Sequence, residues 1–183
     1  MPQRNGCIID TNCLALYIAD SYSTDSITPL PFQQANAIFQ ALVPKVYRNT
    51  SLQDFRELFL QYSFYKTSSY IINETQNILC TTKLQAINSK EVFRYGANLF
   101  RISKQVQDNF VGFVQVVDLS ESNIKWGREQ QISFDEFGIE DMSLIVLALE
   151  LKLPILTLDS RLKAFIRNSL PNVSLVNTEA LIN

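Results

Sequence analysis

Short apolar runs alternate with segments of helical periodicity along this sequence, and that alternation restricts its fold most strongly. The helical segments are residues 52–62, 90–110 and 138–151. The runs that we predict to be strands are residues 6–10, 69–72, 113–118, 154–158 and 173–176. Such an order favours parallel strands joined by right-handed helical crossovers. We therefore expect an α/β fold, a three-layer sandwich with helices on both faces of a central parallel sheet of about five strands.

Length and charge limit the class of protein further. The chain has 183 residues, within the usual range of about 100–200 residues for one domain, so we expect residues 1–183 to form a single domain. A total of 16 Lys and Arg against 18 Asp and Glu gives a net charge of −2, which excludes a strongly basic protein that wraps nucleic acid. The chain contains no histidine, which excludes His-based triads, His general bases and His-ligated zinc.

The cysteines and the apolar runs bear on the cellular compartment. Cys7, Cys13 and Cys80 form no Cys-x-x-Cys pair and are odd in number, which fits a reducing compartment. The first residues lack a signal-peptide stretch, and the longest aliphatic run, residues 144–149, is far shorter than the roughly 20 residues of a membrane span. We expect a cytoplasmic protein that does not enter a membrane.

Three aspartates are predicted to meet at one edge of the sheet. Asp10 closes the first strand and Asp159 follows the fourth, so both lie where open α/β folds bind ligands. Asp141 opens the helix at 138–151, which runs antiparallel to the strand after it and therefore starts at the same edge. Three carboxylates in one cleft repel one another, and a divalent cation would relieve that repulsion. Oxygen ligands without His or Cys select Mg²⁺ or Mn²⁺.

Each acid also has an ordinary structural explanation. Asp10 and Asp159 could each cap the helix that follows, and Asp141 could complement the dipole of its own helix. The convergence of three acids at one edge favours the metal site.

Two groups of basic residues are candidates for binding nucleic acid. Arg94 and Arg101 lie on one side of the helix predicted at 90–110, and Arg161 and Lys163 follow Asp159. They could contact the phosphate backbone, or they could form ordinary solvated helix faces.

Both ends of the chain carry motifs that resemble a known family. The sequence IIDTNCLALY at 8–17 resembles the opening of PIN-domain ribonucleases, in which the first-strand Asp is followed by a small residue and Asn. The sequence GIEDMSLIVLALELKLPILTLDSRL at 138–162 is similar to the second half of that family, where an Asp opens a helix and Thr-x-Asp follows the next strand. Residues 170–181 resemble its closing strand, whereas the middle of the chain matches poorly.

The resemblance implies a strand order of 3-2-1-4-5 and a set of acidic site residues. Asp10, Asp141 and Asp159 match the catalytic and metal-binding acids of the family, and Asn12 and Thr157 would be hydrogen-bonding groups behind them.

A fourth catalytic acid usually lies on the helix after the second strand. Glu74 is the only acid available there, although the family spacing places that acid nearer Asn77.

The implied function is a metal-dependent endoribonuclease that uses Mg²⁺ or Mn²⁺. Single-stranded RNA is the expected substrate, because a cleft at a sheet edge admits a splayed strand more readily than a duplex. A toxin-type nuclease with an antitoxin-type protein partner and a homodimer are both open, and so is a catalytically inactive PIN-like module that binds RNA or serves as a scaffold. A haloacid-dehalogenase-like phosphatase is disfavoured, because it needs an acid where Asn12 stands.

Overall fold

The protein is built on one parallel sheet with helices on both of its faces. The computed structural model describes residues 5–80, 89–103, 111–119, 125 and 137–182. Within them, five strands follow the spatial order β3-β4-β2-β1-β5. The strands are β1 (Gly6–Ile9), β2 (Phe64–Ser68), β3 (Phe100–Ser103), β4 (Val114–Val117) and β5 (Ile155–Leu156). The predicted α/β class with a central parallel sheet is confirmed.

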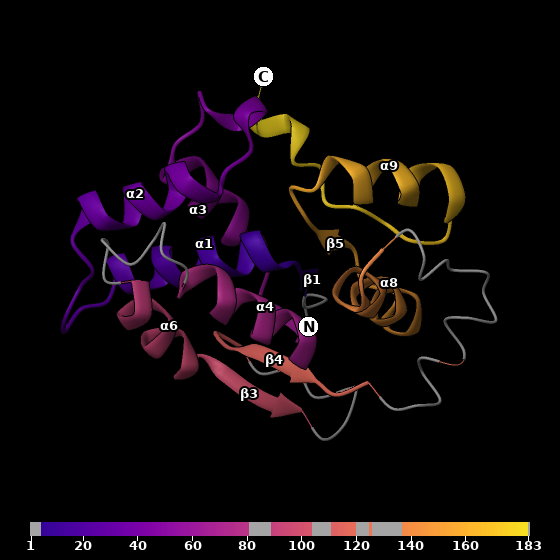
Figure 1. Ribbon diagram of the computed structural model, residues 1–183, viewed down its shortest axis with the longest axis horizontal. Coiled ribbons are helices and arrows are strands. Elements are labelled where there is room, and N and C mark those ends of the chain that lie inside the picture. The colour runs from indigo at the N-terminus through magenta and orange to yellow at the C-terminus, as the bar shows by residue number, and fades with distance from the viewer. Residues whose placement is uncertain (1–4, 81–88, 104–110, 120–124, 126–136, 183) are drawn as a thin grey trace.

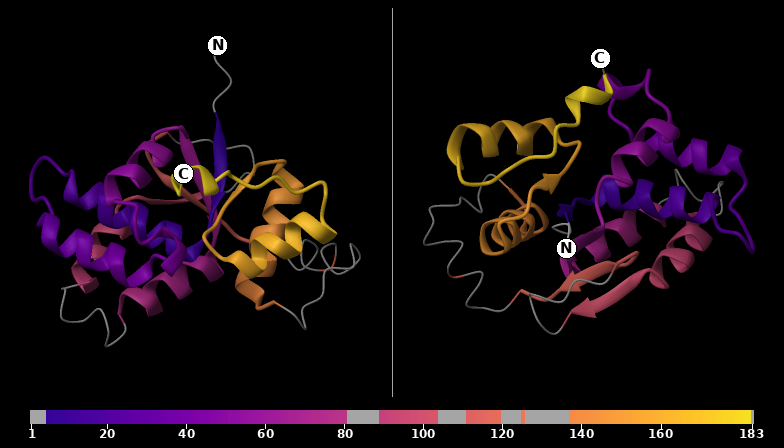
Figure 2. Two further views of the ribbon diagram at one scale, coloured as in Figure 1. Left: turned by 90° about the horizontal axis from the view of Figure 1, so that it is seen from above. Right: turned by 180° about the vertical axis from the view of Figure 1, so that it is seen from behind.

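The helices form two groups, one on each side of the sheet. Figure 1 shows α1 (Thr11–Ser23), α4 (Ser69–Leu79) and α6 (Ser89–Ala97) on one side and α8 (Ile139–Leu151) and α9 (Ser160–Ser169) on the other, and the reverse view in Figure 2 shows the same division. The remaining elements pack beyond α1 or close the chain: α2 (Phe32–Leu42), η1 (Lys45–Tyr47), α3 (Leu52–Phe59) and η2 (Glu179–Leu181). The layers are those of a three-layer sandwich.

The central strand β1 is buried over its whole length. Ile8 pairs with Lys66 of β2 on one side and with Ile155 of β5 on the other. Gly6 lies directly against the ring of Phe64, and a Cβ at this position would overlap that ring. Glycine at this position therefore leaves room for the Phe64 ring beside β1.

Helix α8 is apolar on nearly every side, which is typical of a helix enclosed by other elements. Residues from Met142 to Ala148 are all buried. The helix ends at Lys152, which takes the left-handed conformation with φ 54°, two residues before Pro154. Among the described helices, none has both the length and the apolar character needed to cross a bilayer.

The second strand lies earlier in the sequence than predicted. Residues 69–72 begin helix α4, and the strand is β2 at Phe64–Ser68. The hydroxyl of Ser68 accepts a hydrogen bond from the backbone N–H of Ile71 and so caps α4. The β-rich residues after Ser68 are thus the first turn of an amphipathic helix, whose Ile71 is buried.

The prediction of one helix over residues 90–110 is wrong beyond its first half. Helix α6 ends at Ala97, and residues 100–103 pair with β4 as the edge strand β3. Gly96 packs against Ile18 of α1, so the helix meets a close contact just before the chain turns. Residues 104–110 lie outside the described part of the chain.

The predicted strand order also needs correction at the sheet edges. The predicted segment 173–176 forms only an isolated parallel bridge between Leu175 and Ile155, and the outermost strand on the opposite edge is β3. Between these edges, the expected neighbours of β1 are correct, since β2 and β5 flank it.

We predict that two leucines near the end of α3 contribute very differently to stability. Leu58 is 4% exposed and Leu60 is 78% exposed. Leu58→Ala should lower the free energy of unfolding by about 2–5 kcal/mol, because it removes buried apolar volume. Leu60→Ala, the matched control, should change it by no more than about 0.5 kcal/mol. Urea titration followed by circular dichroism measures both, and equal losses would contradict the packing described for α3.

Candidate active site

The carboxyl end of the sheet brings together acids from separate elements. Asp10 follows β1 directly, and Asp159 follows β5 after Thr157 and Leu158. Asp141 lies in the first turn of α8, and its carboxylate is 3.9 Å from the guanidinium of Arg161 in the first turn of α9. The helix N-termini that carry Asp141 and Asp159 are therefore neighbours, as the antiparallel run of α8 predicts.

Asp10 is the most deeply buried of these acids. Asp10 is only 7% exposed. Its side chain caps α1 by accepting a hydrogen bond from the backbone N–H of Thr11 at 2.6 Å. Its second carboxylate oxygen accepts a hydrogen bond from the Thr157 hydroxyl at 2.5 Å. The Thr157 hydroxyl in turn accepts a hydrogen bond from the backbone N–H of Asp159 at 3.0 Å. One hydroxyl thus fixes the ends of β1 and β5 relative to each other.

Glu74 joins the group through helix α4. The hydroxyl of Thr11 donates a hydrogen bond to the Glu74 carboxylate. Asn77, where the family spacing would place an acid, is exposed one turn further along α4. Thr11 did not stand out in the sequence, and its only signal there is a hydroxyl at the first helical position after Asp10.

A buried serine pair fixes the first turns of α8. The hydroxyls of Ser68, at the end of β2, and Ser143 are 2.6 Å apart, and Ser143 also donates to the backbone carbonyl of Glu140. Asp141 lies between Glu140 and Ser143 and is therefore held against the carboxyl end of the sheet. Neither serine was predicted, because their contact joins positions 75 residues apart.

The acids perturb one another electrostatically. Burial, together with the nearby carboxylates of Asp141 and Glu74, raises the pKa of Asp10 to about 7, although hydrogen bonds from Thr157 and Thr11 oppose this. Burial and the carboxylates of Asp159 and Glu74 raise the pKa of Asp141 to about 6, against the opposing charge of Arg161. Asp10, Glu74, Asp141 and Asp159 therefore share one electrostatic environment, in which protons or a cation must offset the negative charge.

The donor chemistry of this group fits a hard divalent cation. Carboxylate and hydroxyl oxygens are the ligands that Mg²⁺ and Mn²⁺ prefer, and Mg²⁺ commonly uses only one or two carboxylates with several waters. As the side chains stand, no three acidic or cysteine residues in the described ranges are grouped closely enough to hold one ion. The carboxylates of Asp10, Glu74 and Asp159 are engaged by Thr157, Thr11 and the amides of α9, respectively. Metal binding would therefore require water-bridged contacts or rotation of these side chains.

Arg161 and Lys163 were both predicted to bind nucleic acid. Of the two, only Arg161 has an accessible side chain near the acids at the carboxyl edge of the sheet, which we call the acidic edge. Its side chain is 68% exposed, and its guanidinium lies 5.0 Å from the centre of the Phe137 ring. Lys163 is buried, and its ammonium donates to the Tyr47 hydroxyl at 2.9 Å, to Thr178 Oγ1 at 3.0 Å and to Glu179 at 3.1 Å. The ammonium of Lys163 is therefore engaged within the protein and is not exposed to bind a phosphate, contrary to the prediction.

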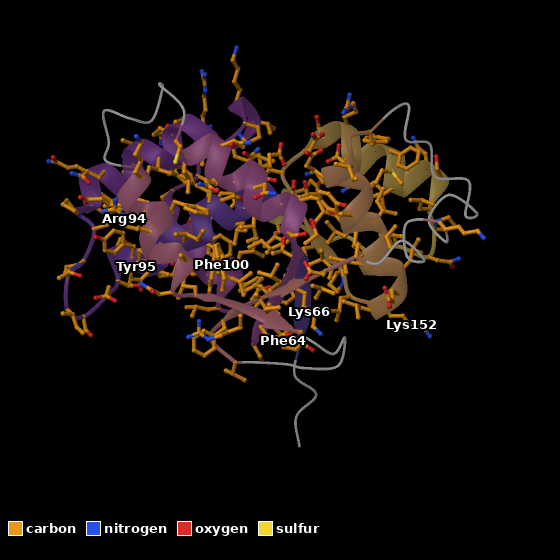
Figure 3. All side chains as sticks on the ribbon, turned by 60° about the horizontal axis from the view of Figure 1, so that its bottom comes forward. Phe64, Lys66, Arg94, Tyr95, Phe100 and Lys152 are labelled. Carbon is orange, nitrogen blue, oxygen red and sulfur yellow. The ribbon has the colours of Figure 1, made fainter. Side chains whose placement is uncertain are left out.

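Arg94 and Arg101 do not form a basic ridge on one helix. Arg94 lies on α6, at the opposite end of the molecule from α8 and α9 (Figure 3). Arg101 lies on β3, where its guanidinium stacks 4.1 Å from the centre of the Phe113 ring and donates to two backbone carbonyls. The two arginines thus belong to different elements, because the predicted helix ends at Ala97.

Asn12 lies beside the acids without contacting them. It is half-buried and lines a small cavity together with Asp159. Its carboxamide makes no hydrogen bond to any residue that the structure describes. Thr157, which was predicted for the same role, does make a hydrogen bond to Asp10.

Comparisons with known proteins add no family assignment. No protein-family model matches the sequence, and no curated protein matches it either. The resemblance of the two chain ends to PIN-domain ribonucleases therefore stays a prediction.

We predict that the fold loses stability as the pH rises when no divalent cation is present. Because the pKa of Asp10 is higher in the folded chain, about 7, than its ordinary value of 3.8, the folded state binds the extra proton between these values. The stabilisation is complete below pH 3.8 and is lost as the pH passes 7. From pH 5 to 7.5, this group alone should reduce the free energy of unfolding by about 2–3 kcal/mol.

Urea titrations in EDTA at these two pH values measure the effect. Asp10→Asn keeps a capping side chain and should remove most of the pH dependence. Glu57→Gln, which changes an exposed acid of α3, should retain it. The same pH dependence in Asp10→Asn and the unmodified chain would refute the assignment to Asp10.

Proposed function

We propose that this protein is a metal-dependent endoribonuclease that hydrolyses phosphodiester bonds of single-stranded RNA. The observation that carries the proposal is the convergence of Asp10, Glu74, Asp141 and Asp159, from four separate elements, at the carboxyl edge of the sheet. Burial chiefly, and the neighbouring carboxylates in addition, raise the pKa of Asp10 and Asp141. Strongly perturbed carboxyls at such an edge are typical of functional sites in open α/β folds.

Each acid has a defined role in this proposal. Asp10, Asp141 and Asp159 would hold Mg²⁺ or Mn²⁺, with Glu74 as the fourth acid. When bound, the cation supplies water activation at neutral pH and offsets the negative charge that develops on the phosphate. This chemistry requires no histidine base, in agreement with a chain that has none.

The neighbouring residues orient the acids and the substrate. The hydroxyls of Thr157 and Thr11 hold the carboxylates of Asp10 and Glu74 in place. The exposed guanidinium of Arg161 can bind a phosphate oxygen of the RNA while it remains near Asp141.

Support for RNA as the substrate comes from the resemblance of residues 8–17 and 138–162 to PIN-domain ribonucleases. The proposal places the enzyme in the cytoplasm. A toxin-type role with an antitoxin-type protein, and a homodimer, are extensions of it that co-purification and sedimentation can test.

The second candidate is a catalytically inactive PIN-like module that binds RNA or acts as a scaffold. One observation favours it: the carboxylates of Asp10 and Asp159 both serve as helix caps, a purely structural use. Binding of RNA without hydrolysis at any Mn²⁺ concentration would select this candidate.

We predict that Asp141→Asn abolishes most of the ribonuclease activity without unfolding the chain. Asp141 is 22% exposed in its side chain, so the neutral amide fits the same space, but it cannot supply a charged ligand. The rate of cleavage of a 5′-labelled single-stranded RNA in Mn²⁺ should fall by at least about 100-fold. EDTA should stop the unmodified enzyme, and Glu57→Gln should cleave normally. Equal residual activity in Asp141→Asn and the unmodified chain would end the nuclease proposal.

We also predict that Arg161 contributes to RNA binding and that Arg167, on the same helix, does not. Arg161→Gln should raise the KM for RNA severalfold and weaken its salt dependence, because one phosphate contact is lost. Arg167→Gln is the matched control, since Arg167 is half-exposed and pairs with Glu179. Steady-state cleavage at several salt concentrations measures both, and indistinguishable KM values for the two variants would contradict the role of Arg161.

A further inference from the structure

A small cavity of about 290 Å³ opens beside Asp159. Asp159 and Asn12 line it on the side of the acidic edge, while Leu158, Pro44 and Val46 supply apolar walls. Val46 is 60% exposed. A single exposed valine is common on protein surfaces, but this one faces a cavity next to the candidate active site.

The wall that carries Val46 is held rigidly. The next residue, Tyr47, is 1% exposed, and its hydroxyl hydrogen-bonds to the Lys163 ammonium at 2.9 Å and to Thr178 Oγ1 at 2.8 Å. The short helix η1 therefore cannot move without breaking a buried polar network. The cavity is preformed, which reduces the ordering cost of binding a ligand there.

The cavity, which Tyr47, Ser160 and Lys163 also line, offers a carboxamide for recognition. The carboxamide of Asn12 has both a donor and an acceptor, and within the described chain neither is used by a neighbour. Amide side chains of this kind read the hydrogen-bonding edges of nucleobases. Lys163 also lines the cavity, but its ammonium is already engaged by Tyr47, Thr178 and Glu179. Because that cation is engaged, the carboxylate of Asp159 disfavours anions in the cavity, and a neutral group is favoured over a phosphate.

We propose that this cavity binds one unpaired nucleobase of the RNA, next to the phosphate held at the acids. The inference rests on the proposed nuclease function and adds to it a site that selects the base. The faces of the base contact Val46 and Leu158, and its edge is read by Asn12. The volume is near the lower limit of about 300 Å³ for small-molecule sites, which suits a single base and excludes a peptide helix or a duplex.

Binding of free nucleosides tests the cavity without any RNA cleavage. Adenosine, guanosine, cytidine and uridine are titrated separately into isotope-labelled protein in EDTA, and NMR follows the side-chain amide of Asn12 and the methyl groups of Val46. We expect saturable shifts at both residues, with one nucleoside bound more tightly than the other three. Nucleosides carry no phosphate, so a response cannot arise from an anion site.

Three variants define the site. Val46→Asp places a charge against the base and should weaken nucleoside binding by at least about tenfold, in line with the usual contribution of base contacts. Val46→Ile keeps a branched apolar side chain at this exposed position and should bind within about twofold of the unmodified protein. Asp141→Asn should bind nucleosides normally, because Asp141 does not line the cavity.

The outcomes separate this inference from the proposed function. If the unmodified protein cleaves RNA but no nucleoside shifts Asn12 and Val46, the base site is refuted and the nuclease stands. If nucleosides bind there but no RNA is cleaved in Mn²⁺, the base site stands and the nuclease is refuted. Unchanged nucleoside affinity in folded Val46→Asp would also overturn the base site.

Discussion

The candidate site depends on a buried carboxyl at the end of the central strand. Asp10 can be buried because its two oxygens accept hydrogen bonds from Thr11 and Thr157, which partly offset the cost of removing a carboxyl group from water. The same two threonines reach outward, one to Glu74 and one to the backbone of Asp159. The group that caps α1 is therefore also the centre of the acidic cluster, and structural and chemical roles coincide at one residue.

The fold supplies the other acids through contacts that are individually ordinary. A nearly all-apolar α8 packs on the sheet, and the buried Ser68–Ser143 pair fixes its first turns beside the end of β2. That arrangement sets Asp141 against the carboxyl edge without any direct bond to Asp10. The base site proposed beside Asp159 depends in the same way on a distant network, since Lys163 holds Tyr47 and with it the wall that carries Val46.

Local sequence patterns predicted the elements that depend on short-range periodicity. The first strand, the strand at Val114–Val117 and the apolar helix α8 lie where their residues indicate. The errors occur where two structures compete for one pattern. Residues after Ser68 have strong β propensity but form a helix because Ser68 caps it, and residues 100–103 continue a helical period but pair with β4. In both places a cap or a tertiary contact overrides intrinsic propensity.

The sequence by itself determined the alternating architecture and the identity of three acids at one edge, because strand direction and helix polarity follow from chain order alone. Only the tertiary structure decided which neighbours those acids have. It placed Glu74 against Thr11, buried Lys163 among Tyr47, Thr178 and Glu179, and left Asn12 facing a cavity. These contacts join positions far apart in the chain. No periodic pattern in the residues between them predicts the packing that brings them together.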